Sequence, residues 1–487
     1  METRNCCNGE WLAGTGASLD VINPATGELL AQVVQSTADD VDAVVSAAQD
    51  AFENWRRTPA TERIQYLFRY KQVLEQSIDE LAQIISSECG KTLGEARGEL
   101  RRGIENVEMA CGAPALLQGY NSEDIAAGID EHLFRQPLGV VTAITPFNFP
   151  GMIPLWFLPY AVACGNCFIL KPSEKTPLTA VRLVELLLET GLPEGVVSLL
   201  HGDGETVSAL IQHPKVRAIS FVGSTPVARE VYAEAARHGK RVQCQGGAKN
   251  PLVILPDADL EMTTQIVADS AFGCAGQRCL AASLAITVGD AAAPFRESIS
   301  SAASDRVVGC GQETSVEMGP VINQASRTRL TEAIDAGVAA GATCVVDGRE
   351  RTVGGYEQGS FLFPTIVDQL PEESPLLKNE LFGPVLGLME VASVDAAIEM
   401  VNSGRFGNMA CLFTRDGAAA RKFRYEVQAG NVGINLGVAA PMAFFPFSGW
   451  GDSFFGDLHA QGRHGVEFYT ETKVVVERWP AEWSRKF

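Results

Sequence analysis

Cys279 is the side chain of this chain best suited to covalent chemistry, and it lies in the run Phe272-Gly-Cys-Ala-Gly-Gln-Arg-Cys279-Leu-Ala-Ala-Ser283. A thiolate can add to a carbonyl carbon and form an acyl thioester, but an ordinary thiol, with a pKa of about 8.5, is only a few per cent thiolate at neutral pH. Cys279 therefore needs positive potential nearby, which Arg278 or a helix end could supply. An isolated cysteine is more often buried structure, and we keep that interpretation for Cys111, Cys164 and Cys411.

Five short motifs follow one another along the chain, and each is weak evidence by itself. Phe221-Val-Gly-Ser224 opens a predicted helix, where free backbone N–H groups favour a phosphate, although a capped turn is an equal alternative. Gly202-Asp-Gly204 does not complete a glycine-rich dinucleotide loop, so we expect a turn there. The five motifs are Pro146-Phe-Asn-Phe-Pro150, Lys171-Pro-Ser-Glu174, Phe221-Val-Gly-Ser224, Gly276-Gln-Arg-Cys279 and Glu380-Leu-Phe-Gly-Pro384.

In this order and approximate spacing, the five motifs resemble those of the aldehyde dehydrogenase superfamily, and the resemblance runs from Val21-Ile-Asn-Pro-Ala-Thr26 to the tail. Four further segments resemble its CoA-acylating branch, the methylmalonate-semialdehyde dehydrogenases. These segments are Arg102-Gly-Ile-Glu-Asn-Val-Glu108, Gly247-Ala-Lys-Asn250, Pro441-Met-Ala-Phe-Phe-Pro-Phe-Ser-Gly-Trp450 and Ser453-Phe-Phe-Gly-Asp-Leu-His459.

The resemblance implies the catalytic roles. Cys279 is the expected nucleophile, and the Asn148 amide with the Cys279 backbone N–H is the expected oxyanion hole, each donor contributing on the order of 3 kcal/mol. Hydrolytic members carry a glutamate base where this chain has Gln245. An amide cannot deprotonate water to cleave a thioester, so we expect coenzyme A to take the acyl group.

The cofactor residues also follow from the resemblance. Lys171 and Glu174 correspond to the pair that binds the adenosine ribose, and a carboxylate there favours NAD over the 2′-phosphate of NADP. Thr145 and Phe147 are expected on the nicotinamide side, Ser224 at a phosphate and Glu380 at the nicotinamide ribose. Three neighbours complete the predicted cofactor-binding set: Lys175, Gly246 and Phe382. No metal is expected.

Two arginines, Arg102 and Arg278, match those that bind the substrate carboxylate in the semialdehyde branch. For Arg102 the alternative is a solvated charged helix face, because Glu99, Arg101 and Glu105 surround it.

Strand-like and helix-like segments alternate from Leu138 onward, which indicates the α/β fold class with parallel, doubly wound sheets. Thr176 is a predicted N-cap with Pro177 at the first helical position. Expected strands in the first half are 139–144, 167–170, 196–200 and 218–222, with a helix at about 226–237. Expected strands in the second half are 283–288, 343–346, 410–413 and 431–435.

Two segments fit neither α/β domain: 119–134, and the alternating tail 466–477, which reads as an edge strand that needs a partner. Pairing between subunits is the favoured use, and packing within the chain is the alternative. In the superfamily equivalent pieces join subunits, so the resemblance implies a homotetramer built from dimers. The predicted domains are NAD-binding (1–118 and 138–246), catalytic (247–445), and an oligomerisation arm with C-terminal tail (119–137 and 446–487).

The overall composition bounds the partners. The 487 residues carry a formal net charge of −20, which argues against nucleic acid or an acidic membrane surface. Twelve cysteines without a signal peptide predict a reducing cytoplasm. No charged residue occurs between Arg135 and Lys171, yet its five prolines and its asparagines favour a buried strand, loop and core helix over a membrane span.

The sequence therefore predicts NAD-dependent oxidative decarboxylation of methylmalonate or malonate semialdehyde to propanoyl-CoA or acetyl-CoA through a Cys279 thioester. One alternative is an aldehyde dehydrogenase that acts on another aldehyde and releases the free acid. The other is a structural or binding protein built on the same fold.

Overall fold

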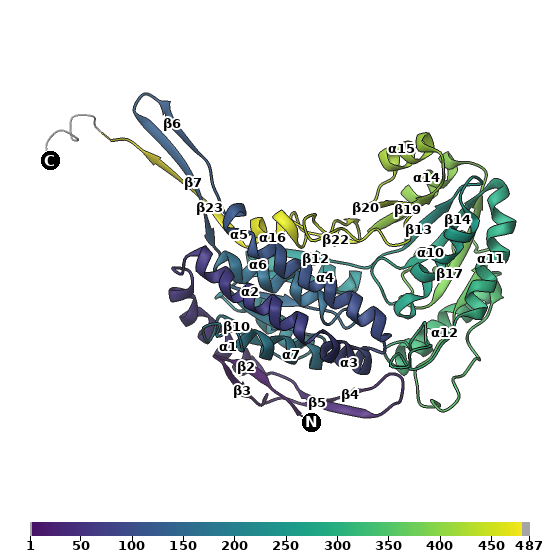
Figure 1. Ribbon diagram of the computed structural model, residues 1–487, viewed down its shortest axis with the longest axis horizontal. Coiled ribbons are helices and arrows are strands. Elements are labelled where there is room, and N and C mark those ends of the chain that lie inside the picture. Colours follow the sequence, from purple (N-terminus) through teal and green to yellow (C-terminus); the bar gives the residue numbers. More distant parts are fainter. Residues whose placement is uncertain (1, 480–487) are drawn as a thin grey trace.

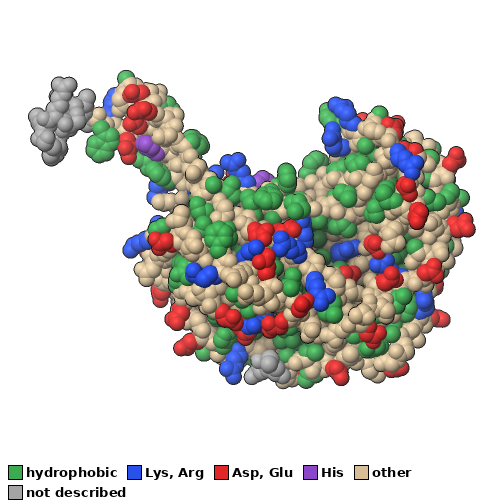
Figure 2. All heavy atoms as spheres, viewed as in Figure 1, with side chains coloured by type: hydrophobic (Ala, Val, Ile, Leu, Met, Phe, Trp, Pro, Cys, Tyr) green, Lys and Arg blue, Asp and Glu red, His purple; other side chains and the backbone are tan. Residues whose placement is uncertain are grey.

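The computed structural model describes residues 2–479, and it contains two large open sheets flanked by helices, together with a projecting three-stranded arm (Figure 1). The last eight residues of the predicted tail lie outside the described residues. Lys and Arg side chains are interspersed with Asp and Glu over the visible face (Figure 2).

The first sheet has eight strands in the order β22-β12-β11-β8-β9-β10-β2-β3. Its five central strands run parallel, and β22, β2 and β3 are antiparallel to their neighbours. In that order the strands are Phe454–Phe455, Arg241–Gln245, Val216–Val222, Val140–Ile144, Cys167–Lys171, Val197–Leu199, Asn5–Cys7 and Glu10–Leu12. The parallel core confirms the predicted doubly wound arrangement.

Two groups of helices flank this sheet, some in direct contact with its strands and others packed on those helices. Those that precede β8 are α1 (Ala38–Trp55), α2 (Ala60–Gln76), α3 (Ile78–Cys89), α4 (Leu93–Cys111) and α5 (Ala113–Leu116). Those between its strands are α6 (Met152–Cys164), α7 (Pro177–Leu188), α8 (Gly204–Gln212) and α9 (Thr225–Arg237). Helix α7 begins at Pro177 with Thr176 as N-cap, as the sequence predicts.

The second sheet has seven strands in the order β15-β16-β17-β14-β13-β19-β20, all parallel except β15. In that order they are Thr343–Val346, Thr365–Asp368, Val385–Val391, Ala282–Val288, Asn250–Ile254, Met409–Phe413 and Asn431–Ile434. Its helices are α10 (Leu260–Phe272), α11 (Ala292–Asp305), α12 (Gln324–Ala339), α13 (Pro375–Lys378), α14 (Val394–Asn402) and α15 (Gly417–Glu426). There are also two small sheets. One has the strand order β1 (Glu2–Thr3), β5 (Leu29–Val34) and β4 (Ser18–Ile22), and the other pairs β18 (Phe406–Gly407) with β21 (Trp450–Gly451).

The arm consists of β6 (Asn121–Ala126), β7 (Ile129–Pro137) and β23 (Thr470–Glu477). The prediction of a strand from Val466 was wrong for its first residues, because α16 covers Gly462–Phe468 and buries Val466 and Phe468. Strand β23 pairs with β7 of the same chain over all eight of its residues, so one of its two edges is satisfied within the chain. Strand β23 still lies at the edge of the arm sheet (Figure 1).

The uncharged stretch between Arg135 and Lys171 forms β8, a loop, α6 and β9. Nearly every residue of α6 is buried, and among the described residues no helix has the length and apolar character to cross a bilayer. Gly103 of α4 permits the close approach of α6, since a Cβ there would lie 2.8 Å from a methyl carbon of Leu155. The interpretation of this stretch as strand, loop and core helix is confirmed.

Candidate active site

Cys279 lies where two cavities meet. A cavity of about 270 Å³ lies beside α4, and a larger one of about 680 Å³ lies over the carboxyl ends of the first sheet's parallel strands. Cys279 and Phe149 line both. Ligands of open α/β sheets bind at the carboxyl ends of strands. A thiol at this junction can therefore contact two ligands that enter from different sides.

The loop that carries Cys279 is tightly constrained. It leaves α10 through a turn in which Cys274 and Ala275 both have φ of 52°. Gly276 follows with φ of 68°, and a Cβ there would overlap the carbonyl oxygen of Gly383, so only glycine fits.

Two side-chain amides hold the nucleophile's backbone. Asn250 Nδ2 and Asn408 Nδ2 donate to the carbonyl oxygen of Cys279 at 2.9 and 2.8 Å. Asn250 is the first residue of β13 and Asn408 immediately precedes β19, so the position of the thiol is fixed from the amino ends of two strands of the second sheet.

Burial dominates the electrostatics of the thiol. It raises the pKa of Cys279 to about 12, and the negative charge of Glu380 raises this pKa further. The backbone N–H of Cys279, the Arg278 guanidinium and the N–H of Leu280 act in the opposite direction. Arg278 thus lowers the pKa as expected, but without ligands burial outweighs it and the thiol is protonated at neutral pH.

Asn148 lies in the loop after β8 and is 5% exposed. Its Nδ2 donates one hydrogen to the carbonyl oxygen of Gln277 at 2.9 Å. An amide carries two N–H donors, so the second remains for a ligand. Asn148 and Cys279 line the larger cavity together, and the predicted oxyanion pair is brought to one place.

Both predicted carboxylate-binding arginines line the smaller cavity, but their surroundings differ. Arg102 pairs with Glu105 at 2.7 Å and also donates to the carbonyl oxygen of Pro441. Arg278 donates through Nη2 to the carbonyl oxygens of Asp269 and Ser270, whereas its Nε is buried without a hydrogen-bond partner in the protein. Arg102 uses both of its terminal nitrogens in these contacts and Arg278 only Nη2, so Arg278 keeps more donor capacity for an anion.

Two carboxylates, Glu95 and Glu99, also line the smaller cavity, and both are engaged. Glu95 accepts from the backbone N–H groups of Thr92 and Cys274, and Glu99 is paired with Lys91. Gln245, at the end of β12, lines neither cavity: it is 3% exposed and donates to the carbonyl oxygen of Phe447 at 3.3 Å.

The larger cavity collects most of the predicted cofactor residues. It is lined by Thr145, Phe147, Lys171, Glu174, Ser224, Gly246, Glu380 and Phe382. Lys175 does not line it. Its ammonium lies over the Phe147 ring, 5.3 Å from the ring centre, so it supports a lining residue from behind.

Glu380 is the most perturbed carboxyl group of this cavity. Burial raises its pKa to about 7, while the N–H of Ala248, which donates to Oε1 at 2.9 Å, and the charges of Lys249 and Arg329 lower it. A Cβ at Gly247 would overlap its Oε2, so the glycine at 247 lets this carboxylate approach. Phe382, with φ of 56°, packs edge-on against Phe147 beside it.

The cavity fits a dinucleotide. Ser224 is the N-cap of α9 without a side-chain capping bond, which leaves the first backbone N–H groups of that helix for a phosphate. Lys171 Nζ lies 3.9 Å from Glu174 Oε2, so the two residues predicted to bind the adenosine ribose lie together.

Sequence reasoning missed several residues of the site. Asp203 and Gly204, interpreted only as a turn, begin α8 and line the larger cavity, as does Arg329 from α12. Asp203 follows a strand and caps a helix, a signal that was available in the sequence. Nothing local marks Arg329, Asn250 or Asn408, because each reaches the site from a distant part of the chain.

Comparisons with known proteins agree with this geometry. The chain matches the aldehyde dehydrogenase family over residues 11–475. It is 49% identical to malonate-semialdehyde dehydrogenase 1 of Geobacillus thermodenitrificans (strain NG80-2), over 98% of each chain.

Two solved structures are also similar. Methylmalonate-semialdehyde dehydrogenase from Oceanimonas doudoroffii superposes with a TM-score of 0.98 at 44% identity, over 100% of each chain. A protein from Sinorhizobium meliloti 1021, crystallised with NAD, superposes with a TM-score of 0.97 at 40% identity, over 99% of this chain and 98% of that one. The chain belongs to the aldehyde dehydrogenase family.

Proposed function

We propose that the protein oxidises malonate or methylmalonate semialdehyde with NAD and delivers the product as acetyl-CoA or propanoyl-CoA. One observation carries the proposal: the cavity that ends at Cys279 presents two guanidinium groups, while both of its carboxylates are already engaged. A guanidinium binds a carboxylate in a fixed geometry. The names of the relatives from Geobacillus and Oceanimonas point to the same substrates.

The chain's own residues account for the addition step. The Cys279 thiol releases its proton to solvent and its Sγ adds to the aldehyde carbon. The second amide hydrogen of Asn148, with the Cys279 N–H, stabilises the alkoxide that forms. Arg278 holds the substrate carboxylate and fixes which end of the molecule faces the thiol. Lys171, Glu174 and Glu380 line the larger cavity and would hold NAD there, and the bound cofactor would supply the hydride acceptor for conversion of the adduct into a thioester.

The resulting thioester carries a carboxylate on the carbon next to its carbonyl. Its C–C bond can break to release CO₂, and the electron pair remains as an enolate whose oxygen lies in the same oxyanion hole. Protonation of the enolate carbon leaves an acetyl or propanoyl group on Cys279. The sulfur of CoA then attacks the carbonyl carbon, and Cys279 departs.

Water is a poor acceptor on the side of the smaller cavity, because the two carboxylates there that could deprotonate it are already engaged. In the sequence, Gln245 occupies the position at which the resemblance implies a glutamate base in hydrolytic members, and Glu95 and Glu99 already accept hydrogen bonds. The specific observation that favours release of a free acid instead is Glu380, a carboxyl group with a pKa near 7 in the cavity that Cys279 also lines.

The cofactor preference rests on Glu174, whose carboxylate beside Lys171 suits the ribose diol of NAD and repels a 2′-phosphate. We also infer a homotetramer built from dimers through the arm, and a cytoplasmic location, where all twelve free cysteines would stay reduced.

The test is NADH production from malonate semialdehyde with and without CoA, together with identification of the product. We expect acetyl-CoA as product and only a small residual rate without CoA. Equal rates in both cases, with a free acid released, would refute CoA acylation and favour the alternative at Glu380.

A further inference from the structure

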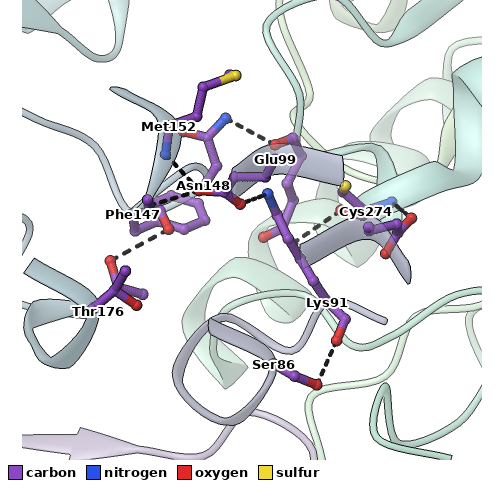
Figure 3. A network of polar contacts seen from close by, with 12 residues as sticks. Ser86, Lys91, Glu99, Phe147, Asn148, Met152, Thr176 and Cys274 are labelled. Carbon is purple, nitrogen blue, oxygen red and sulfur yellow. Dashed lines mark hydrogen bonds and ion pairs between the residues drawn. The ribbon is translucent and has the colours of Figure 1, made fainter. Parts of the chain in front are cut away.

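One face of α4 touches both loops that carry the proposed catalytic groups. Glu95 and Glu99 are one helical turn apart and therefore share that face. Glu95 Oε1 accepts from the N–H of Cys274 at 2.5 Å, in the loop that leads to Cys279. Glu99 Oε1 accepts from the N–H groups of Gly151 and Met152 at 2.7 and 3.0 Å (Figure 3).

The contact of Glu99 lies close to Asn148 in the chain. Gly151 and Met152 are the third and fourth residues after Asn148, and they start α6. Gly151, the N-cap of α6, provides no side-chain cap, so Glu99 supplies the acceptor from another helix. A carboxylate at a helix N-terminus is also favoured by the helix dipole. Glu99 therefore fixes the end of the loop on which the oxyanion donor lies.

Glu99 is kept in place by a buried cation. Lys91 Nζ lies 2.5 Å from Glu99 Oε2, and both side chains are almost fully buried, at 2% and 0% exposure. The ammonium also lies over the Phe149 ring, 3.5 Å from its centre, and Ser86 Oγ donates to the Lys91 carbonyl oxygen at 2.6 Å (Figure 3). A buried carboxylate is costly unless it is paired and hydrogen-bonded, and Glu99 is both.

Glu99 lines the smaller cavity, yet it has little capacity to act on a substrate. Its two oxygens accept two backbone N–H groups and one ammonium. A carboxylate held in this way orients the groups that donate to it.

We propose that Glu99 is a positioning residue for the oxyanion hole, with Lys91 as its counterion. Through Gly151 and Met152 it fixes the Asn148 loop, while Glu95 on the same helix holds the loop of Cys279. Helix α4 thus sets the separation between the amide and the thiol. The inference rests on the proposed catalytic roles of Asn148 and Cys279.

The proposal predicts a particular kinetic signature. An oxyanion donor acts as the alkoxide develops, so its displacement slows the chemical step and leaves substrate binding nearly unchanged. The rate constant of the first NADH burst, measured without CoA, should therefore fall while the KM for the semialdehyde stays within about threefold.

Two variants distinguish the effect of side-chain length at position 99 from the effect of its charge. Glu99→Asp keeps the charge but withdraws the carboxylate by one methylene from the α6 amides. Glu99→Gln with Lys91→Met removes both charges but keeps an acceptor of the original length. We expect Glu99→Asp to slow the burst about tenfold and the double variant to slow it less than about threefold, with thermal melting reporting whether each variant is folded.

Combination with Asn148→Ala decides whether Glu99 acts through Asn148. If it does, Glu99→Asp adds less than about twofold to the loss already caused by Asn148→Ala, because residues that act through one another are not additive. Two results would refute the positioning role of Glu99 and leave the proposed function intact. One is that the losses from Glu99→Asp and Asn148→Ala multiply, and the other is that Glu99→Gln with Lys91→Met is slower than Glu99→Asp. A burst at the unmodified rate in Asn148→Ala itself would refute the proposed role of Asn148 and this inference with it.

Discussion

Asn148 donates one hydrogen of its side-chain amide to the carbonyl oxygen of Gln277, 2.9 Å away and two residues before Cys279. The bond joins the loop after β8 to the loop after α10, so donor and nucleophile are held by one direct contact. It also orients the second amide hydrogen, which is the one available to an alkoxide.

Replacement of Asn148 by Ala should therefore slow the NADH burst about 100- to 1,000-fold, the usual loss of one oxyanion donor. Alkylation of Cys279 by iodoacetamide forms no alkoxide, so its rate in Asn148→Ala should stay within about threefold of the rate in the unmodified protein. A comparable loss in both reactions would mean that the substitution displaces the thiol, and that Asn148 is not an oxyanion donor.

Arg278 should select carboxylated aldehydes. Arg278→Met keeps the approximate length of the side chain but removes the guanidinium that would pair with the substrate carboxylate, together with its hydrogen bonds to the carbonyl oxygens of Asp269 and Ser270. Loss of one partner of a buried charge pair costs about 2–5 kcal/mol, so kcat/KM for malonate semialdehyde should fall at least about 30-fold, and for propanal far less.

Arg102→Ala should show the same selectivity with a smaller loss, because Glu105 already neutralises part of its charge. Arg101→Ala is the matched control: this neighbour is half-exposed and pairs with Glu75 and Glu108 outside both cavities. Equal losses for both substrates in the Arg278 and Arg102 variants would make these residues structural and remove the basis of the substrate assignment.

Glu380 should control the reactivity of the thiol in a pH-dependent way. Its charge raises the pKa of Cys279, and that charge is present only above its own pKa of about 7. Glu380→Gln should thus accelerate alkylation of Cys279 above pH 7, by up to about tenfold, since one pKa unit is tenfold in thiolate. Below pH 7 the two proteins should converge. An identical pH profile from pH 6 to 9 would show that the carboxylate does not act on the thiol.

Removal of β23 should break the assembly. The chain should end after Thr470, because Tyr469 is buried with its hydroxyl 2.8 Å from Ser220 Oγ, and Arg241 donates to the Thr470 carbonyl oxygen. We expect species smaller than a tetramer by light scattering, since β7 loses its partner strand. A chain ending after Trp479 keeps β23 and is the control. A tetramer from the shorter chain would show that this strand does not join subunits.

The alternating elements were predictable because their signals are local. Buried strands such as β8 and β9 are continuous apolar runs between turn residues, and α7 starts with Thr176 and Pro177. The tail was mispredicted at 466–469, because a short helix buries Val466 and Phe468 and the strand begins only at Thr470. Alternation of side chains alone cannot distinguish such a helix from a strand. Its in-chain pairing with β7 spans more than three hundred residues, a distance over which no local pattern is informative.

The candidate site likewise contains residues that were predictable from local motifs and residues that were not. Cys279, Asn148 and Glu380 lie in motifs of recognisable order, so their assembly was expected. The supports of these groups were not: Asn250 and Asn408 reach the Cys279 carbonyl oxygen, and Lys91 and Glu99 reach the start of α6. Each is an ordinary polar residue in sequence and acquires its role only from tertiary contacts.

The most direct test of the account is the mass of the protein after it is mixed with malonate semialdehyde and NAD without CoA. We predict about one NADH per active site and one acetyl adduct on Cys279, which disappears when CoA is added and leaves acetyl-CoA. Continuous NADH release without an adduct, or an adduct that water removes as fast as CoA does, would contradict the account.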